Sequence, residues 1–276
     1  MVVFLNGKFV EEKDAKVSVF DHGFLYADGV YETLRTYGGK VWQIDEHLKR
    51  LIRSAVFIGL DIPWSLRQMG SWILQTVKNN GFGESRIRMT VTRGENGFDF
   101  GKAKKPTICI QVQKLEPQPA RVYSQGVRAV SFCVERTLPE AKTLNLLPMA
   151  MAQRFMLKQM AYEALLVNHH GCVTEGTVTN VFMVKNRVLV TPNRGMLAGT
   201  TRDVILKIAR KLKVKVELRD IKLPEMYRAD EIFISNAPRG IVPVVRLDGN
   251  VIGAGRCGKE TRGLMVTFEE YVQSLI

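Results

Sequence analysis

The sequence lacks any apolar run that approaches the roughly 20 residues needed to span a bilayer. Its first residues contain neither the basic stretch nor the long apolar core of a signal peptide. Its four cysteines include no Cys-x-x-Cys pair, which argues against a zinc site and against a disulfide framework. We therefore expect a cytoplasmic protein with no membrane segment and no bound metal.

Two common phosphate-binding motifs are also absent, because no Gly-x-Gly-x-x-Gly stands between a strand and a helix and no P-loop lysine is present. Positive charge, in contrast, is plentiful: 40 lysines and arginines against 27 aspartates and glutamates give a net charge of +13. These basic residues are spread along the chain, so nucleic acid is not the expected partner. A diffuse positive field improves solubility and attracts small anions such as 2-oxo acids or phosphate esters.

The first part of the chain contains both strand and helix patterns. Asn-Gly at residues 6–7 predicts the turn of a hairpin, and a second hairpin is expected around residues 38–39. Helical spacing of apolar residues predicts one helix that begins at an Asp45 N-cap and stops at Gly59, and another that ends at Gly81. Two further strand patterns follow.

A Pro-Gln-Pro segment then interrupts the pattern, since proline joins neither a sheet ladder nor a helix interior. We expect an N-terminal domain at residues 1–115, a linker at 116–121 and a C-terminal domain at 122–276. In the last of these, strand patterns are interleaved with two helices, at about residues 149–162 and from Thr200 onward. These patterns predict an α+β fold with two domains.

The helix that starts at Thr200 could bind an anion. Thr200 and Asp203 resemble a capping box, and Gly199 before them would let a ligand approach the backbone closely. Backbone N–H groups and the helix dipole at such a start favour a negative group such as a phosphate. The same residues are also typical of an ordinary capped helix.

A lysine and a glutamate supply the other groups that a phosphorylated pyridine aldehyde requires. Lys142 follows a turn and precedes an apolar stretch, where partial desolvation would lower its pKa and make the amine nucleophilic. Glu175, just before a strand, could hold a pyridine nitrogen protonated. Taken singly, Lys142 also fits a surface lysine and Glu175 a turn residue. Arg50 lies away from the apolar face of its helix, so periodicity predicts a solvated side chain.

Several short segments occur in an order and spacing typical of one family. They are DHGFLYADGVYE at residues 21–32, EHLKRL at 46–51, SA at 54–55, AKTLN at 141–145, TEG at 174–176, NVF at 180–182, LAGTTR at 197–202, ADE at 229–231 and VPV at 242–244. As a set they resemble the class IV pyridoxal-phosphate-dependent aminotransferases of the branched-chain and D-amino-acid type. The resemblance implies a fold-type IV enzyme with a smaller N-terminal α/β domain and a larger, β-rich C-terminal domain. It also implies pyridoxal 5′-phosphate as cofactor and a homodimer.

The resemblance implies a role for each matching residue. Lys142 would form the Schiff base with the cofactor, and Glu175 would pair with its pyridinium nitrogen. Leu197 would press on one face of the ring, and Tyr31 would line the substrate pocket. The contacts to the phosphate side would come from Arg50, Asn180, Thr200 and Thr201.

The implied reaction is a transamination between an amino acid and a 2-oxo acid. A donor amine displaces Lys142, and the freed lysine moves a proton between the α-carbon of the donor and the cofactor. The protonated ring absorbs the electron pair, and hydrolysis releases a 2-oxo acid. A second oxo acid then reverses the sequence.

The residues at the substrate end of the site do not agree on a subfamily. Leu146 stands where branched-chain members often have a tyrosine, which favours the D-amino-acid type. The Arg-x-His clamp of well-known D-amino-acid members is absent from residues 95–100. Arg88 lies where branched-chain members have a pocket arginine, and it could bind a substrate carboxylate, as could Arg35 or Arg239. Each of these arginines could equally form an ion pair elsewhere.

Asn236 and Ala237 introduce an alternative activity. With the preceding serine they resemble the aminodeoxychorismate lyases, which use the same cofactor linkage to eliminate pyruvate and give 4-aminobenzoate. Many aminotransferases have a hydroxyl residue near the phosphate at this position. We expect Asn236 and Ala237 on the substrate side of the site, and the lyase is the alternative to the transaminase. A basic binding protein without catalytic activity is a third possibility.

Overall fold

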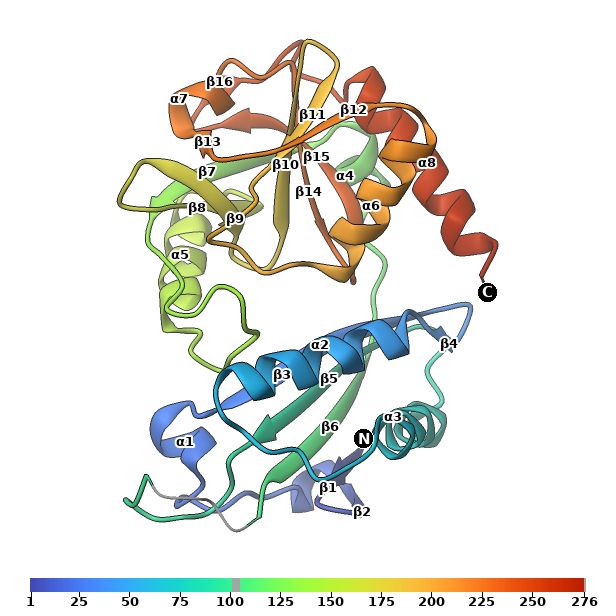
Figure 1. Ribbon diagram of the computed structural model, residues 1–276. Helices are drawn as coiled ribbons and strands as arrows, with labels where there is room; N and C mark the ends of the chain where they lie inside the picture. The colour runs from blue at the N-terminus through green and yellow to red at the C-terminus, as the bar shows by residue number, and fades with distance from the viewer. Residues whose placement is uncertain (101–104, 276) are drawn as a thin grey trace. The chain divides into compact units, whose positions relative to one another are not determined.

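The computed structural model describes residues 1–100 and 105–275. Strands and helices alternate in both halves of the chain, and the strands form one sheet of six and one of ten (Figure 1). The predicted α+β class is therefore confirmed. Within the described residues, no helix combines the length and the apolar character needed to cross a membrane.

The chain divides into two compact units. Unit 1 comprises Met1–Glu116 together with Ala141–Asn145, and unit 2 comprises Pro117–Glu140 and Leu146–Leu275. The short segment that carries Lys142 therefore belongs to unit 1, although the sequence pattern groups it with residues 122–276. The predicted domain boundaries treat each domain as one continuous stretch, whereas unit 1 is built from two.

Unit 1 is an antiparallel sheet with two long helices packed against it (Figure 1). Its strands follow the order β2-β1-β6-β5-β3-β4. They are β1 (Val2–Leu5), β2 (Lys8–Glu11), β3 (Gly29–Tyr37), β4 (Lys40–Val41), β5 (Ser85–Thr92) and β6 (Thr107–Lys114). The helices are the short α1 (His22–Tyr26), α2 (Ile44–Phe57) and α3 (Leu66–Asn80), with a 3-10 turn, η1 (Glu12–Asp14). Both predicted hairpins are confirmed.

Strand β3 explains how unit 1 forms its core. Alternate residues of the strand, Val30, Glu32, Leu34 and Thr36, are all 0% exposed, as expected for side chains on the covered face of a sheet. The apolar members pack with Leu48 and other side chains of α2 and α3. Glu32 is thus a carboxylate in a core-facing position.

The start of α2 differs from its prediction. The helix begins at Ile44, and its N-cap is Gln43 in the left-handed conformation, so the predicted Asp45 N-cap is wrong. Asp45 lies in the first turn, where its negative charge interacts favourably with the positive end of the helix dipole. The predicted end is confirmed, because the helix closes at Ile58 and Gly59 follows with a φ of +63°.

Unit 2 is built on a mixed sheet in the order β12-β11-β10-β14-β15-β7-β8-β9-β13, with β16 paired to β15. Its strands are β7 (Val127–Cys133), β8 (Glu163–Val167), β9 (Cys172–Gly176), β10 (Asn180–Lys185), β11 (Val188–Thr191), β12 (Lys215–Leu218), β13 (Ile221–Lys222), β14 (Glu231–Asn236), β15 (Gly240–Leu247) and β16 (Asn250–Val251). Its helices are α4 (Ala120–Ser124), α5 (Leu147–Lys158), α6 (Thr200–Lys211), α7 (Leu223–Met226) and α8 (Lys259–Gln273). Helix α5 contacts β7 and β8, whereas α6 and α8 contact each other and β14 (Figure 1).

Candidate active site

The start of α6 has a glycine at its N-cap, so the N-cap residue offers no side chain to cap the helix. Gly199 is the N-cap and Thr200 is the first helical residue, so the predicted capping box of Thr200 and Asp203 is wrong. The hydroxyl of Thr201 is buried and has no hydrogen-bond partner within residues 1–100 and 105–275. Backbone N–H groups at a helix start, beside a buried hydroxyl, form a donor set that suits a phosphate. Thr200 and Thr201 therefore fit the phosphate of the expected cofactor.

Asn180 holds the backbone just ahead of this helix. Its side-chain Nδ2 donates to the carbonyl of Leu197 at 2.7 Å, and the residue itself is buried in β10. A Cβ added to Gly199 would lie 2.0 Å from the Oδ1 of Asn180, so only glycine fits there without displacing the amide. Asn180 thus supports the phosphate side through the backbone of residues 197–199.

A second buried hydroxyl lies next to Asn180 in the sheet. Ser235 pairs with Asn180 across β10 and β14. Its Oγ is buried, and in the part of the chain that the structure describes it has no hydrogen-bond partner. Sequence reasoning assigned no role to Ser235, although the hydroxyl residue common in this region of aminotransferases was a usable signal.

Asn236 and Ala237 follow at the end of β14. The Asn236 side chain donates to the carbonyl of Val178 at 3.2 Å and accepts from the N–H of Arg239 at 2.9 Å. Its amide therefore fixes the turn after β14 and the turn between β9 and β10. A direct substrate contact by Asn236 or Ala237 stays a prediction.

Glu175 lies in strand β9 and not in a turn, and it is 5% exposed. Its Oε2 accepts from the N–H of Leu197 at 3.1 Å, and its Oε1 lies 3.2 Å from Nη1 of Arg136. The arginine stabilises the ionised form of the carboxylate, which is the form that can hold a pyridine nitrogen protonated. The same contacts fix Leu197 beside Glu175. Sequence reasoning missed Arg136, which lies in a loop without periodic pattern.

Glu163 shapes the turn that joins Glu175 to Asn180. It lies in β8 and is 1% exposed. Its Oε1 accepts from the N–H and the hydroxyl of Thr177 at 3.1 and 2.6 Å, and its Oε2 accepts from the hydroxyl of Thr179 at 3.1 Å. One buried carboxylate therefore fixes both polar side chains of the turn.

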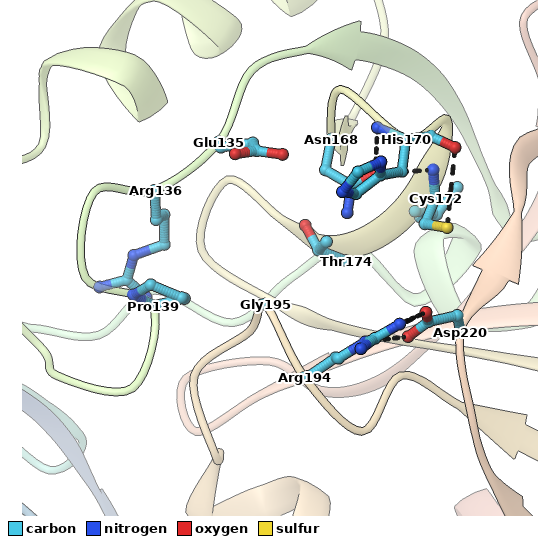
Figure 2. A pocket seen from close by; sticks show the side chains of 11 residues that line it. Glu135, Arg136, Pro139, Asn168, His170, Cys172, Thr174, Arg194, Gly195 and Asp220 are labelled. Carbon is cyan, nitrogen blue, oxygen red and sulfur yellow. Dashed lines mark hydrogen bonds and ion pairs between the residues drawn. The ribbon is translucent and has the colours of Figure 1, made fainter.

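A cavity of about 290 Å³ lies beside Arg136 in unit 2 (Figure 2). Thr174 and Gly195 line it, and the ion pair of Arg194 with Asp220 closes one side. Figure 2 shows Arg136 and this ion pair on different parts of the wall. Strand β9 and residues 194–197, which contribute to the cavity wall, also carry Glu175 and Leu197, the residues expected to bind the cofactor ring. The cavity therefore lies next to these two residues, on the side where Arg136 contacts Glu175.

In unit 1, the backbone of Lys142 is fixed on both sides. Its N–H donates to the hydroxyl of Ser54 at 3.0 Å, and its carbonyl accepts from the N–H of Tyr31 at 2.9 Å. Thr143 forms a bridge with Val30, which adds the segment to the edge of β3. The Nζ of Lys142 lies 4.4 Å from the centre of the Tyr31 ring. These contacts distinguish Lys142 from an ordinary surface lysine.

Arg88 shares this environment. Its Cζ lies 4.0 Å from the centre of the Tyr31 ring, so the arginine and Lys142 both contact the same aromatic side chain. Of the other two candidate arginines, Arg35 in unit 1 stacks on Tyr37 and approaches Glu84 at 3.7 Å, and Arg239 in unit 2 lies over Tyr162. Of the two candidates in unit 1, Arg88 is the one that shares the Tyr31 ring with Lys142.

Arg50 is 6% exposed, so the solvated side chain predicted from periodicity is wrong. Its Nε and Nη2 donate to the two carboxylate oxygens of Glu32, each at 2.7 Å. The periodicity argument considered only apolar residues and therefore could not detect a carboxylate on the covered face of β3. Unit 1 thus carries Tyr31, Arg50, Arg88 and Lys142, and unit 2 carries the other expected site residues.

The sequence and the fold match known proteins over nearly the whole chain. The family model for amino-transferase class IV matches residues 29–247. A Methanocaldococcus jannaschii protein named as a branched-chain-amino-acid aminotransferase is 41% identical over 280 residues, which cover 98% of this chain and 96% of the relative. A D-alanine aminotransferase of Staphylococcus epidermidis is 34% identical over 278 residues, which cover 99% and 98%.

Solved structures give the same result. The branched-chain aminotransferase of Thermoproteus uzoniensis, solved with norvaline, has a TM-score of 0.91 at 29% identity, covering 99% of this chain and 95% of that one. The 4-amino-4-deoxychorismate lyase of Pseudomonas aeruginosa has a TM-score of 0.85 at 28% identity, covering 97% and 98%. The predicted fold type is confirmed. The chain belongs to the class IV aminotransferases, which use pyridoxal 5′-phosphate.

Proposed function

We propose that this pyridoxal-phosphate-dependent aminotransferase moves the amino group of a branched-chain or D-amino acid to a 2-oxo acid by way of Lys142. The observation that supports it most directly is the placement of Lys142, whose backbone is fixed by Ser54 and Tyr31 while its amine lies against the Tyr31 ring. When bound, the cofactor supplies a carbonyl that takes up the amino group and a ring that accepts electrons.

Lys142 would hold the cofactor covalently and, once released, would move a proton to and from the α-carbon of the substrate. A positioned amine is suited to such general acid–base work. Glu175 would hold a proton at the pyridine nitrogen. Arg136 and the N–H of Leu197 orient that carboxylate, and both contacts favour its ionised form.

The phosphate would be held by Arg50 and by the start of α6. Thr200 and Thr201 would contribute backbone N–H groups. The buried hydroxyls of Thr201 and Ser235, which have no hydrogen-bond partner among residues 1–100 and 105–275, would donate to the phosphate as well. Asn180 keeps the Leu197 carbonyl, and thereby the approach to the helix, in place. This arrangement would bind and orient the cofactor but would move no proton.

Arg88 and Tyr31 would receive the substrate. An arginine that stacks on an aromatic ring keeps its guanidinium edges available in a fixed plane, which suits a carboxylate. The M. jannaschii relative is named for branched-chain amino acids and the S. epidermidis relative for D-alanine. We therefore propose both branched-chain amino acids and D-amino acids as candidate substrate classes for this enzyme.

A spectral half-reaction with the holoenzyme tests the proposal. L-leucine and D-alanine are mixed separately with the enzyme, and the absorbance of the bound cofactor is recorded before and after addition of a 2-oxo acid. At least one donor should bleach the band, and the oxo acid should restore it. If neither these nor other L- or D-amino acids change the spectrum, the proposed substrate classes are wrong.

The lyase remains the second candidate because Asn236 and Ala237 resemble that subfamily and because the P. aeruginosa lyase is structurally similar. A lyase would release pyruvate from aminodeoxychorismate in the absence of any oxo acid. Pyruvate release without a second substrate, together with no exchange between amino acids and oxo acids, would favour it over the transaminase.

We further propose a homodimer in the cytoplasm. Unit 1 exposes several apolar side chains close together in the sequence, namely Val17, Val19, Phe20 and Phe24. Clustered exposed apolar residues are typical of a contact surface. The four cysteines are free thiols, as in proteins of reducing compartments. Light scattering should give twice the monomer mass, and Phe24→Ser should shift the mass toward the monomer.

A further inference from the structure

Two titratable side chains, Glu32 and His47, form a buried cluster with the arginine that the proposed function assigns to the phosphate. Glu32 on β3 is 0% exposed and contacts two residues of α2. Its oxygens accept from Nε and Nη2 of Arg50 at 2.7 Å each, and its Oε2 also lies 2.8 Å from Nδ1 of His47. The carboxylate therefore occupies one complete edge of the guanidinium.

The charge states within this cluster follow from its contacts. Burial by itself raises the pKa of Glu32, but the charge of Arg50 and the hydrogen bonds from Arg50 and His47 outweigh it and hold the pKa far below the ordinary value. Burial also lowers the pKa of His47, although Glu32 opposes this. His47 is thus neutral near neutral pH. An ionised carboxylate only accepts hydrogen bonds, so Nδ1 of His47 must carry the proton.

We propose that Glu32 and His47 are positioning residues that fix the guanidinium of Arg50 for the phosphate of the cofactor. The inference rests on the proposed function, because it assumes that Arg50 contacts the phosphate. Glu32 binds the Nε–Nη2 edge of the guanidinium in a bidentate geometry, so Nη1 lies on the side of this planar group opposite the carboxylate. His47, one turn before Arg50 on α2, contacts the Oε2 of Glu32 and restrains the carboxylate.

The position of Glu32 argues for such a role over simple stabilisation of the fold. Its neighbours on the covered face, Val30 and Leu34, are apolar and equally buried. Replacing a buried ion pair by apolar residues of similar size is often neutral or stabilising, so a core needs no carboxylate at this point. In contrast, an arginine that must be held in one orientation beside a cofactor site does need a carboxylate that accepts two of its hydrogen bonds.

The test compares the affinity of the apoenzyme for pyridoxal 5′-phosphate and for pyridoxal, which lacks the phosphate. The ratio of the two dissociation constants reports on the phosphate contact alone, because general damage to the fold weakens both ligands. In Glu32→Gln the amide NH₂ cannot accept from Arg50 or His47. We expect the preference for the phosphorylated ligand to fall about 10- to 100-fold, as when an orienting partner of a ligand-binding side chain is lost.

Glu84→Gln is the matched control. Glu84 is also a carboxylate of unit 1 near an arginine, Arg35, but it lies at the partly exposed end of the sheet. Its substitution should leave the ratio unchanged. A fall in the ratio equal to that of Glu32→Gln would show a general effect of lost carboxylates and would overturn the proposal.

A pair of His47 variants provides a second, independent test of the proposal. His47→Asn places an amide nitrogen near the position of Nδ1 and should keep the ratio within a few-fold of the wild-type value. His47→Leu removes the donor and should lower the ratio clearly. If Glu32→Gln does not fold, this pair decides the matter, and an unchanged ratio in His47→Leu contradicts the proposal.

Arg50→Lys separates the inference from the proposed function. If the ratio falls in Arg50→Lys but stays at the wild-type value in Glu32→Gln, Arg50 binds the phosphate without help from Glu32 and the inference is wrong. If the ratio is unchanged in both variants, Arg50 does not bind the phosphate and its proposed role fails. A fall in both, with Glu84→Gln unchanged, supports the positioning role.

Discussion

Lys142 owes its environment to main-chain contacts, and this makes its side chain easy to test. The hydrogen bonds to Ser54 and Tyr31 use its N–H and carbonyl, so Lys142→Ala retains them. We expect an intact fold by circular dichroism and a loss of multiple turnover of at least about 100-fold, since the general acid–base group is removed. Turnover close to the wild-type value would exclude Lys142 as the catalytic lysine. Lys49→Ala, on the exposed face of α2, should retain full activity.

The proposed role of Glu175 can be tested by a substitution that replaces one carboxylate oxygen by an NH₂ group. Glu175→Gln preserves the shape of the side chain but removes the charge that would hold a proton on the pyridine nitrogen. Removal of one such electrostatic contact costs roughly 100- to 1000-fold in rate, and we expect the half-reaction with an amino donor to slow by this amount. An unchanged half-reaction rate would show that another group partners the ring. Glu217→Gln, a partly exposed carboxylate that also contacts an arginine, serves as control.

At the scale of elements, the start of α6 depends on the glycine at its N-cap, Gly199. Gly199→Ala would place a Cβ 2.0 Å from Oδ1 of Asn180, whose amide is buried and bonded to Leu197. Such overpacking costs about 1–3 kcal/mol. We expect a lower melting temperature for the holoenzyme and weaker binding of pyridoxal 5′-phosphate.

The matched substitution is Gly263→Ala in α8, where an added Cβ meets nothing within 4 Å. Alanine in a helix interior is favoured over glycine by about 1 kcal/mol, so this variant should be as stable as the wild type or more stable. If both variants lowered cofactor affinity equally, crowding at Asn180 would not be the cause.

The elements also show what a single sequence can and cannot predict. Hairpins with Asn-Gly or Gly-Gly turns, and the helices α2, α3, α5 and α6 with their regular apolar spacing, follow from local chemistry and were predicted. Strand β15 was missed because Pro243 lies inside it and proline is normally excluded from central strands. Helix α8 was missed although Leu264, Phe268 and Val272 recur every four residues on its buried side. Contacts such as Arg50 with Glu32 or Arg136 with Glu175 join distant segments, and local periodicity contains no information about them.

For the whole molecule, the buried Glu32 cluster predicts a dependence of stability on pH. Both Glu32 and His47 have a pKa below the ordinary value in the folded state. The unfolded chain therefore binds more protons as the pH falls, and the free energy of unfolding decreases with it. For His47 the loss begins as the pH falls below 6.5, and for Glu32 below 4.5.

Urea unfolding at a series of pH values would measure this effect. The wild type should lose stability steadily from about pH 6 toward pH 3, and Glu32→Gln should show a shallower loss below about pH 4.5, because it lacks the titrating carboxylate. A parallel pH dependence in the two proteins would indicate that other carboxylates dominate acid unfolding.

The division of the chain into units has a consequence for biosynthesis. Unit 1 takes its last described segment, Ala141–Asn145, from beyond the first part of unit 2. A nascent chain that has emerged only as far as Glu116 contains the whole six-stranded sheet but not the bridge between Val30 and Thr143. The edge of β3 at Val30 and Tyr31 thus stays open on the ribosome until residue 145 has emerged, and the segment that closes it delivers Lys142. Completion of the N-terminal fold and placement of the proposed catalytic lysine are therefore one event.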